Sequence, residues 1–70
     1  MEIIRFKIFC IEMYRLEHNI TVKKTIEIFK KYKVLEFIES FFDVLHTCDD
    51  RFIVQDIDEY LFARGYIKKQ

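Results

Sequence analysis

The sequence predicts an all-α fold, a small bundle of four short helices formed by a single domain over residues 1–70. Three observations predict it. The chain has no proline and only one glycine, which disfavours a turn-rich β sandwich. Large apolar residues recur at helical spacing, and residues typical of helix caps separate these apolar segments. Seventy residues suffice for one domain, and an apolar content of 51% excludes a disordered chain.

The first predicted helix spans Ile3–His18. Apolar residues alternate with polar ones near its start, which also suits a strand, but the alternation is lost later and the length favours a helix. Apolar side chains surround most of this helix, and such a helix is normally buried. It is expected to end at His18 and Asn19, because asparagine tolerates the left-handed conformation.

Two further helices are predicted in the middle of the chain. The second spans Val22–Tyr32 and follows Thr21, whose hydroxyl is expected to cap it. Its expected inner stripe is Val22, Ile26, Phe29 and Tyr32. The third spans Leu35–His46, with an inner stripe of Leu35, Ile38, Phe42 and Leu45 that Phe37, Phe41 and Val44 widen.

The strongest break in the chain covers residues 47–50, where Thr and Asp side chains favour a turn. Residues 51–54 are either extended or helical. The last helix is expected from Val54 or Gln55 to Arg64, with three carboxylates near its positive end, Asp56, Asp58 and Glu59. Gly65 is the expected left-handed stop, against which Tyr66 or Ile67 folds back.

Charge is uneven along the chain, although 12 basic and 12 acidic residues cancel overall. Residues 1–33 carry eight basic and four acidic side chains, and residues 34–70 carry the reverse. The basic set is Lys23, Lys24, Lys30, Lys31 and Lys33; the acidic set is Glu36, Glu39, Asp43, Asp49, Asp50, Asp56, Asp58 and Glu59. Both sets are either solvated helix faces or, for the acidic one, a docking surface for a basic partner. Nucleic-acid binding is disfavoured because the lysines lack interleaved arginines.

No constellation of residues predicts catalysis, a metal or a cofactor. The candidate zinc ligands lack the spacing of zinc motifs: Cys10, His18, His46 and Cys48. The acidic residues around Asp50 lack the ligand spacing and the glycine of a calcium loop. Three carboxylates share one helical face, Glu36, Glu39 and Asp43, but a thin core offers little room for a pocket that shifts a pKa. We therefore predict that the protein is not an enzyme.

The apolar N-terminal stretch does not predict a signal peptide. Arg5, Lys7 and Glu12 interrupt it, and no small-residue cleavage site follows. No segment approaches the uncharged apolar length that spans a bilayer. We expect a cytoplasmic protein without membrane association, in which Cys10 and Cys48 stay reduced.

Eight phenylalanines and four tyrosines are many for so small a domain. Either some lie at the surface and mark a partner site, or they form a dense miniature core. The candidates for exposure are Phe37, Phe41, Phe62, Tyr66 and some of Phe6, Phe9 and Tyr14. The predicted partner-binding residues combine apolar anchors with a charged rim: Phe37, Phe41, Phe62, Tyr66, Glu39, Asp43, Asp56 and Glu59.

Five short motifs follow one another in the order of a known family: Phe9–Tyr14, His18–Thr21, Lys31–Val34, Leu45–Thr47 and Asp56–Glu59. They resemble short bacterial proteins grouped as domain of unknown function 3791, over nearly the whole chain. That family usually has glycine where this chain has Lys33. A tighter or kinked corner is therefore expected there, in place of a clean left-handed stop.

The resemblance implies little chemistry. Genes of the family tend to lie beside one for a larger protein that resembles an ADP-ribosyltransferase fold, which suggests a toxin and a small cognate partner. The leading hypothesis is a non-enzymatic protein-binding module, an antitoxin-like or accessory partner of such a protein. The alternatives are a small DNA-binding regulator that uses the second helix, and a structural homodimer that packs through the first.

Overall fold

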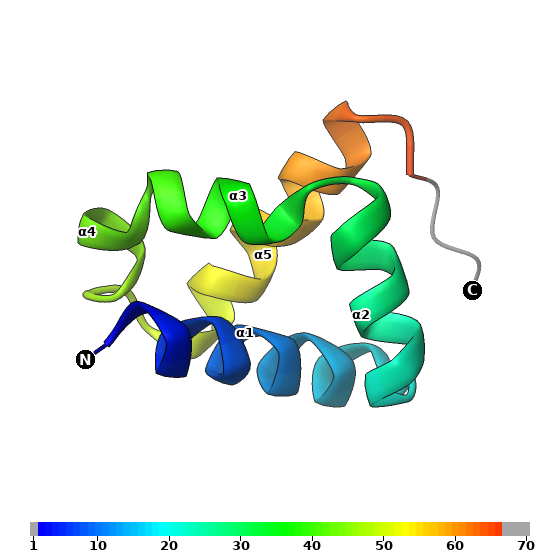
Figure 1. Cartoon of the computed structure of the whole chain (residues 1–70), viewed down its shortest axis with the longest axis horizontal. Helices are drawn as coiled ribbons and strands as arrows, with labels where there is room; N and C mark the ends of the chain where they lie inside the picture. Colours follow the sequence, from blue (N-terminus) through cyan, green and yellow to red (C-terminus); the bar gives the residue numbers. More distant parts are fainter. Residues whose placement is uncertain (1, 67–70) are drawn as a thin grey trace.

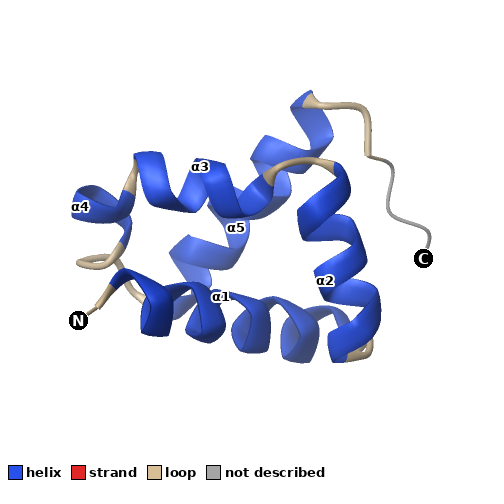
Figure 2. Cartoon of the chain, in the orientation of Figure 1, coloured by secondary structure: helices blue, strands red, loops and turns tan. Residues whose placement is uncertain are grey.

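The computed structural model describes residues 2–66, and every element in that range is a helix (Figure 1, Figure 2). The helices are α1 (Ile3–His18), α2 (Val22–Lys31), α3 (Val34–Ser40), α4 (Phe42–Leu45) and α5 (Asp50–Ala63). The predicted all-α class is confirmed. In Figure 1, α2 rises from the end of α1, α3 returns above α1, and α5 crosses behind both. None of the described helices combines the length and the apolar character needed to cross a membrane.

One face of α1 packs in the core, and the opposite face is exposed to solvent. Phe6, Cys10 and Tyr14 lie at spacings of four residues and are almost completely buried. Ile4 and Ile8 lie on the opposite side and are 65% and 61% exposed. The outer face of α1 is therefore not buried within the single chain, because too few elements exist to surround it.

The capping residues predicted from the sequence are confirmed. The Thr21 hydroxyl accepts the backbone N–H of Lys24 at 3.0 Å. Asn19 ends α1 in the left-handed conformation with φ at 55°, and Gly65 follows α5 with φ at 94°. Tyr66 folds back, and its backbone N–H donates to the Leu61 carbonyl at 3.0 Å. Ile67, the other candidate for this contact, lies outside the described residues.

The corner between α2 and α3 is left-handed even though glycine is absent. Lys33 adopts φ 58° and ψ 39° and directly precedes the first residue of α3. The expectation of a tighter or kinked corner is therefore wrong. A lysine in this conformation has a steric cost that glycine avoids, so the surrounding packing must hold it there.

The buried face of α2 is rotated relative to the prediction. Thr25, Ile28 and Phe29 face the core, whereas Val22 is 43% exposed. Thr25 can be buried because its hydroxyl donates to the Thr21 carbonyl at 2.9 Å. This local hydrogen bond satisfies the polar group that the apolar pattern had assigned to solvent.

The predicted third helix is interrupted at Phe41, whose φ of −113° and ψ of 22° separate α3 from α4. Its apolar stripe suits one continuous helix, so the pattern contains no sign of the break. Ile38 and Leu45 are buried as predicted. After the break, the Phe42 ring packs edge-on against Phe6 at 5.4 Å, and Phe41 remains at the surface.

The last helix begins earlier than predicted. Its N-cap is Asp49, whose carboxylate accepts the backbone N–H of Arg51 at 2.9 Å. Residues 51–54 are therefore helical, and burial of Ile53 and Val54 on the core face explains why. The three carboxylates expected near the positive end of this helix lie in its middle and late turns instead, at positions 56, 58 and 59.

Most of the aromatic side chains pack in the interior, and only a few lie at the surface. Among the 12 rings, three are exposed, those of Phe41, Phe52 and Phe62. Phe6 and Tyr14 are buried and Phe9 is half-buried, so the expected exposure within this group is wrong. A dense miniature core and an exposed aromatic remainder therefore coexist.

Candidate functional site

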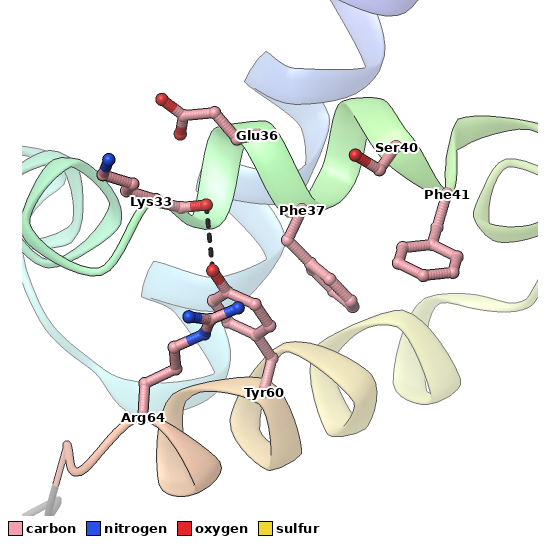
Figure 3. Close-up of a pocket in the computed structure, with 7 residues that line it drawn as sticks. All are labelled: Lys33, Glu36, Phe37, Ser40, Phe41, Tyr60 and Arg64. Atoms are coloured by element: carbon pink, nitrogen blue, oxygen red, sulfur yellow. Dashed lines mark hydrogen bonds between the residues drawn. The ribbon is translucent and has the colours of Figure 1, made fainter.

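An open groove of about 370 Å³ lies between α3 and α5 (Figure 3). Its walls come from two segments that are far apart in the sequence. The corner before α3, α3 itself and the break after it contribute one wall, and the end of α5 contributes the other. The residues that line it are Lys33, Glu36, Phe37, Ser40, Phe41, Tyr60 and Arg64.

Three rings and a guanidinium form a continuous row along this groove. The Phe37 and Phe41 ring centroids are 5.2 Å apart. Phe37 also stacks on Tyr60, with 4.4 Å between the centroids and 25° between the planes. The Arg64 guanidinium lies 4.7 Å from the Tyr60 ring centroid. The row therefore joins both walls of the groove through ring contacts and one cation–π contact.

Helical spacing explains why each wall presents its side chains together. Phe37 and Phe41 are four residues apart, as are Tyr60 and Arg64, so each pair lies on one side of its helix. Figure 3 shows Phe37 and Phe41 extending from α3 toward α5, with Tyr60 reaching back toward the corner.

The Tyr60 ring is fixed in place by its hydroxyl group. The hydroxyl donates to the Tyr32 carbonyl at 2.8 Å and lies 3.2 Å from the Lys33 carbonyl. Both carbonyls belong to the corner after α2, and the Lys33 carbonyl also accepts the backbone N–H of Phe37 at 3.2 Å. The left-handed corner therefore supplies acceptors that position one wall of the groove.

The groove lining carries one carboxylate, Glu36, and two cations, Lys33 and Arg64. Residues 34–66 contain eight carboxylates and two arginines. Glu36 lines the groove and is exposed, and the described part of the chain offers it no ion-pair partner. The lysines of α2, at positions 23, 24, 30 and 31, are all exposed on a different helix.

Of the predicted partner-binding residues, the structure brings two together in the groove. Phe37 is half-buried there, and Phe41 is 51% exposed. Phe62 is 76% exposed but follows Tyr60 by two residues, so it points to the opposite side of α5. Tyr66 is half-buried and packs against Tyr32, with 5.4 Å between the ring centroids.

The predicted charged rim is spread over three helices. Glu39 is exposed on α3, and its carboxylate lies 3.9 Å from the Lys7 ammonium of α1. Asp43 is exposed on α4. Asp56 and Glu59 lie on α5, the first half-buried and the second exposed. None of the four lines the groove itself.

Sequence reasoning missed Tyr60 and Arg64, which complete the groove. Their spacing of four residues was visible, but tyrosine and arginine at that spacing are common on helix surfaces. Glu36 was noted only as a member of a row of carboxylates, and Lys33 only as a basic residue at a corner. No sequence signal shows that α5 packs beside α3.

A second polar cluster joins α1 to α5, with the His18 side chain nearly buried and the Asp58 side chain partly exposed. The His18 Nε2 atom lies 3.0 Å from the Asp58 Oδ1 atom, and the His18 ring packs 4.3 Å from that of Tyr14. Burial raises the pKa of the Tyr14 phenol, and the charge of Asp58 adds to the shift. The imidazole expected only to favour the end of α1 therefore links α1 to α5 through a residue 40 positions later in the chain.

The cysteines are both free thiols. Cys10 is buried, and burial raises the pKa of its thiol to about 12, so it stays protonated. The Cys48 thiol lies 3.4 Å from the Val44 carbonyl of its own turn. Within residues 2–66, no three His, Cys, Asp or Glu side chains gather in a way that could hold a metal ion.

Comparisons with known proteins give one match. No curated protein and no solved structure matches the chain. Residues 5–64 match the model of a family described as a protein of unknown function, DUF3791. This match spans α1 to the end of α5, including both walls of the groove. The chain belongs to the DUF3791 family.

Proposed function

We propose that this protein is a non-enzymatic protein-binding module that receives a partner in the groove between α3 and α5. The observation that carries the proposal is the row of Phe41, Phe37, Tyr60 and Arg64 along an open groove. Aromatic and arginine side chains are the residue types that contribute most to binding energy in protein interfaces.

The rigidity of the groove supports this proposal. Tyr60 is held by its hydroxyl at the corner after α2, and Phe37 is held by stacking on Tyr60. Side chains that are already ordered lose little conformational entropy when a partner binds. Phe41 is the exception, since half of its surface is exposed, and we assign it the role of the anchor that the partner covers.

The partner that we propose is a larger ADP-ribosyltransferase-like protein of the kind that tends to be encoded beside genes of this family. The chain would act as its antitoxin-like or accessory partner. The identity of the partner comes from the gene neighbourhood that the family tends to have, and the groove supports the statement that a protein docks there. The two statements therefore need one experiment that can separate them.

The experiment is co-expression of the tagged chain with that larger protein, followed by isothermal titration of the purified pair. Replacing Phe41 with alanine should weaken binding by at least about tenfold, as expected for a central anchor. Phe62→Ala is the matched control, because Phe62 is exposed on the opposite side of α5, and it should change affinity by less than about twofold. Circular dichroism should show both variants folded.

Two results would contradict the proposal in different ways. A complex that forms equally well with Phe41→Ala would mean that the groove is not the docking site. The absence of any complex at micromolar concentration would remove this partner and its antitoxin-like role.

A homodimer is a second candidate, supported by the outer face of α1, where Ile4 and Ile8 are exposed one turn apart. Packing this face across a twofold axis would bury both residues in each copy. Sedimentation equilibrium tests it. A dimer that Ile8→Glu converts to a monomer would support this candidate, and a monomeric wild-type protein would exclude it.

DNA binding through α2 is a third candidate, because its four lysines are exposed. A gel shift that weakens with salt and with Lys24→Glu would favour it. A protein that shifts no DNA at low salt would exclude it.

A further inference from the structure

We propose that a second groove, between α1 and α5, receives a basic amphipathic segment of a protein, which covers Leu16 and places an arginine or lysine beside Glu17 and Asp50. Two observations carry the proposal. One is an apolar floor that is partly open to solvent, and the other is an excess of carboxylates over arginine in the lining. The proposal does not depend on the groove between α3 and α5 or on what binds there.

The second groove consists of two adjoining hollows of about 280 Å³ and 250 Å³. Glu17, Arg51 and Val54 line both hollows, so the two form one continuous depression along the pair of helices. Residues 13–18 of α1 supply one wall, and residues 50–58 of α5 supply the other. Within residues 2–66, this lining shares no residue with that of the groove between α3 and α5.

Met13, Leu16 and Val54 give the second groove an apolar floor. Val54 is buried and Met13 is half-buried, whereas Leu16 is 55% exposed. Met13 and Leu16 are three residues apart, so they lie side by side on α1. A single exposed leucine is ordinary on a protein surface. This one borders a hollow with two other apolar residues, so one apolar side chain of a partner contacts all three at once.

Carboxylates dominate the charged lining. Glu17, Asp50 and Asp58 line the second groove, and Arg51 is the one arginine or lysine that the described residues place there. Glu17 and Asp50 are exposed, and neither forms an ion pair within the part of the chain that the structure describes. Charge complementarity therefore favours a basic segment over an acidic one.

The third carboxylate, that of Asp58, holds the two walls together. The His18 Nε2 atom lies 3.0 Å from Oδ1 and 3.1 Å from Oδ2 of Asp58. This contact joins the end of α1 to α5 at one end of the groove. Walls that are already fixed lose little conformational entropy when a partner binds. We therefore assign Asp58 a positioning role and assign Glu17 and Asp50 the contact with the partner's cation.

An amphipathic basic helix fits this combination. The methylene stem of an arginine or lysine lies along an apolar surface while its charged head reaches a carboxylate. A leucine one turn away on the same helix then covers Leu16 and Met13. Docking of an amphipathic helix in an apolar groove is a common mode of peptide recognition.

The test is an NMR titration of the isotope-labelled full chain with two synthetic peptides. One is an amphipathic peptide with leucines four residues apart and arginines beside them, and its twin has glutamates in place of the arginines. The arginine peptide should shift the backbone amide resonances of Leu16, Glu17 and Val54. The glutamate twin should bind at least about fivefold more weakly.

Substitutions in the second groove give the decisive comparison. Glu17→Lys should weaken binding of the arginine peptide by at least about threefold and improve binding of the glutamate twin. Glu27→Lys is the matched control, since it makes the same change of net charge at an exposed position of α2, and it should alter either affinity by less than about twofold. Leu16→Ala should weaken both peptides, whereas Phe41→Ala in the other groove should weaken neither. Circular dichroism should show all four variants folded.

Several results would overturn the inference. These are equal binding of the two peptides, no binding of either peptide, or equal effects of the changes at positions 17 and 27. Loss of peptide binding with Phe41→Ala, and not with Leu16→Ala, would place the segment in the other groove. Shifts that grow with protein concentration before peptide is added would identify a second copy as the occupant. Capture of the larger protein through Phe41 is a separate measurement, so the proposed function and this inference can fail independently.

Discussion

Lys33 joins α2 to α3 with φ at 58° and ψ at 39°, a conformation that costs a residue with a side chain roughly 1–2 kcal/mol. Its side chain is exposed, and the described residues give its ammonium group no ion pair. Replacement by glycine removes the steric cost. Glycine in turn adds conformational freedom to the unfolded chain, which costs about 0.5–1 kcal/mol. The net expectation for Lys33→Gly is a gain of about 0.5–1 kcal/mol in the free energy of unfolding.

Urea titration followed by circular dichroism would measure this gain, and a melting curve should rise by about 2–8 °C for a domain of this size. Two controls separate backbone from side chain. Lys33→Ala keeps the steric cost and should change the free energy of unfolding by less than about 0.5 kcal/mol. Glu27→Gly, at an exposed position within α2, should lose about 1 kcal/mol because it only weakens a helix.

Two outcomes would refute the reasoning. If the glycine at position 33 destabilised the protein as much as the glycine at position 27, the corner would not be strained. If Lys33→Ala gave the same gain as Lys33→Gly, removal of the lysine charge would be the cause. Either outcome would also remove the argument that tertiary packing holds this corner in place.

Further predictions test other parts of the structure. Phe6→Ala should lower the free energy of unfolding by about 3–5 kcal/mol because the ring is buried. Phe62→Ala should change it by less than about 1 kcal/mol. Urea titration would compare the two variants, and similar losses would contradict the assigned core. Tyr60→Phe should cost about 1–2 kcal/mol by removing the hydroxyl that donates to the Tyr32 carbonyl, and an unchanged stability would show that the hydroxyl does not hold the ring. Burial raises the pKa of the Cys10 thiol from its usual 9.0 to about 12. Below about pH 9 the thiol is protonated in both the folded and the unfolded chain, and above that pH it ionises first in the unfolded chain. The free energy of unfolding should therefore fall as the pH rises from about 9 toward about 12. A thiol reagent at pH 8 should accordingly modify the Cys10→Ser variant, which retains Cys48, much faster than Cys48→Ser, and equal rates would contradict the burial of Cys10.

The sequence predicted those features that depend on a side chain and its nearest backbone. Thr21, Asn19 and Gly65 each act within one helical turn, and all three lie where the pattern placed them. A capping hydroxyl or a left-handed asparagine needs no distant partner, so its effect is readable locally. The same locality explains why α1 was predicted with correct bounds.

The errors arose where packing overrides local pattern. Residues 51–54 include the β-branched Ile53 and Val54, which suit an extended segment. Burial of these two residues beside α1 and α3 favours a helix instead. Thr25 replaced Val22 on the buried face of α2 because a hydrogen bond satisfied its hydroxyl. Neither choice can be made before the neighbouring helices are placed.

The candidate site was half predicted for the same reason. Phe37 and Phe41 were identified because they make the stripe of their segment wider than one neighbour can cover. Tyr60 and Arg64 were missed because a groove needs two walls, and the second wall comes from a helix about twenty residues later. Phe62 and Tyr66 were included because exposure on α5 and at its end could not be assigned to particular faces.

The corner at Lys33 connects the stability of the fold with the shape of the groove. Its left-handed conformation orients the carbonyls of residues 32 and 33 so that both accept the Tyr60 hydroxyl. Only the backbone makes these contacts, so Lys33→Gly should stabilise the protein without moving Tyr60. Tyr60→Phe should lower the stability of the protein and weaken binding in the groove, because it frees the ring on which Phe37 stacks. A glycine variant that gained stability but lost affinity for a partner would show that the Lys33 side chain, which lines the groove, takes part in binding.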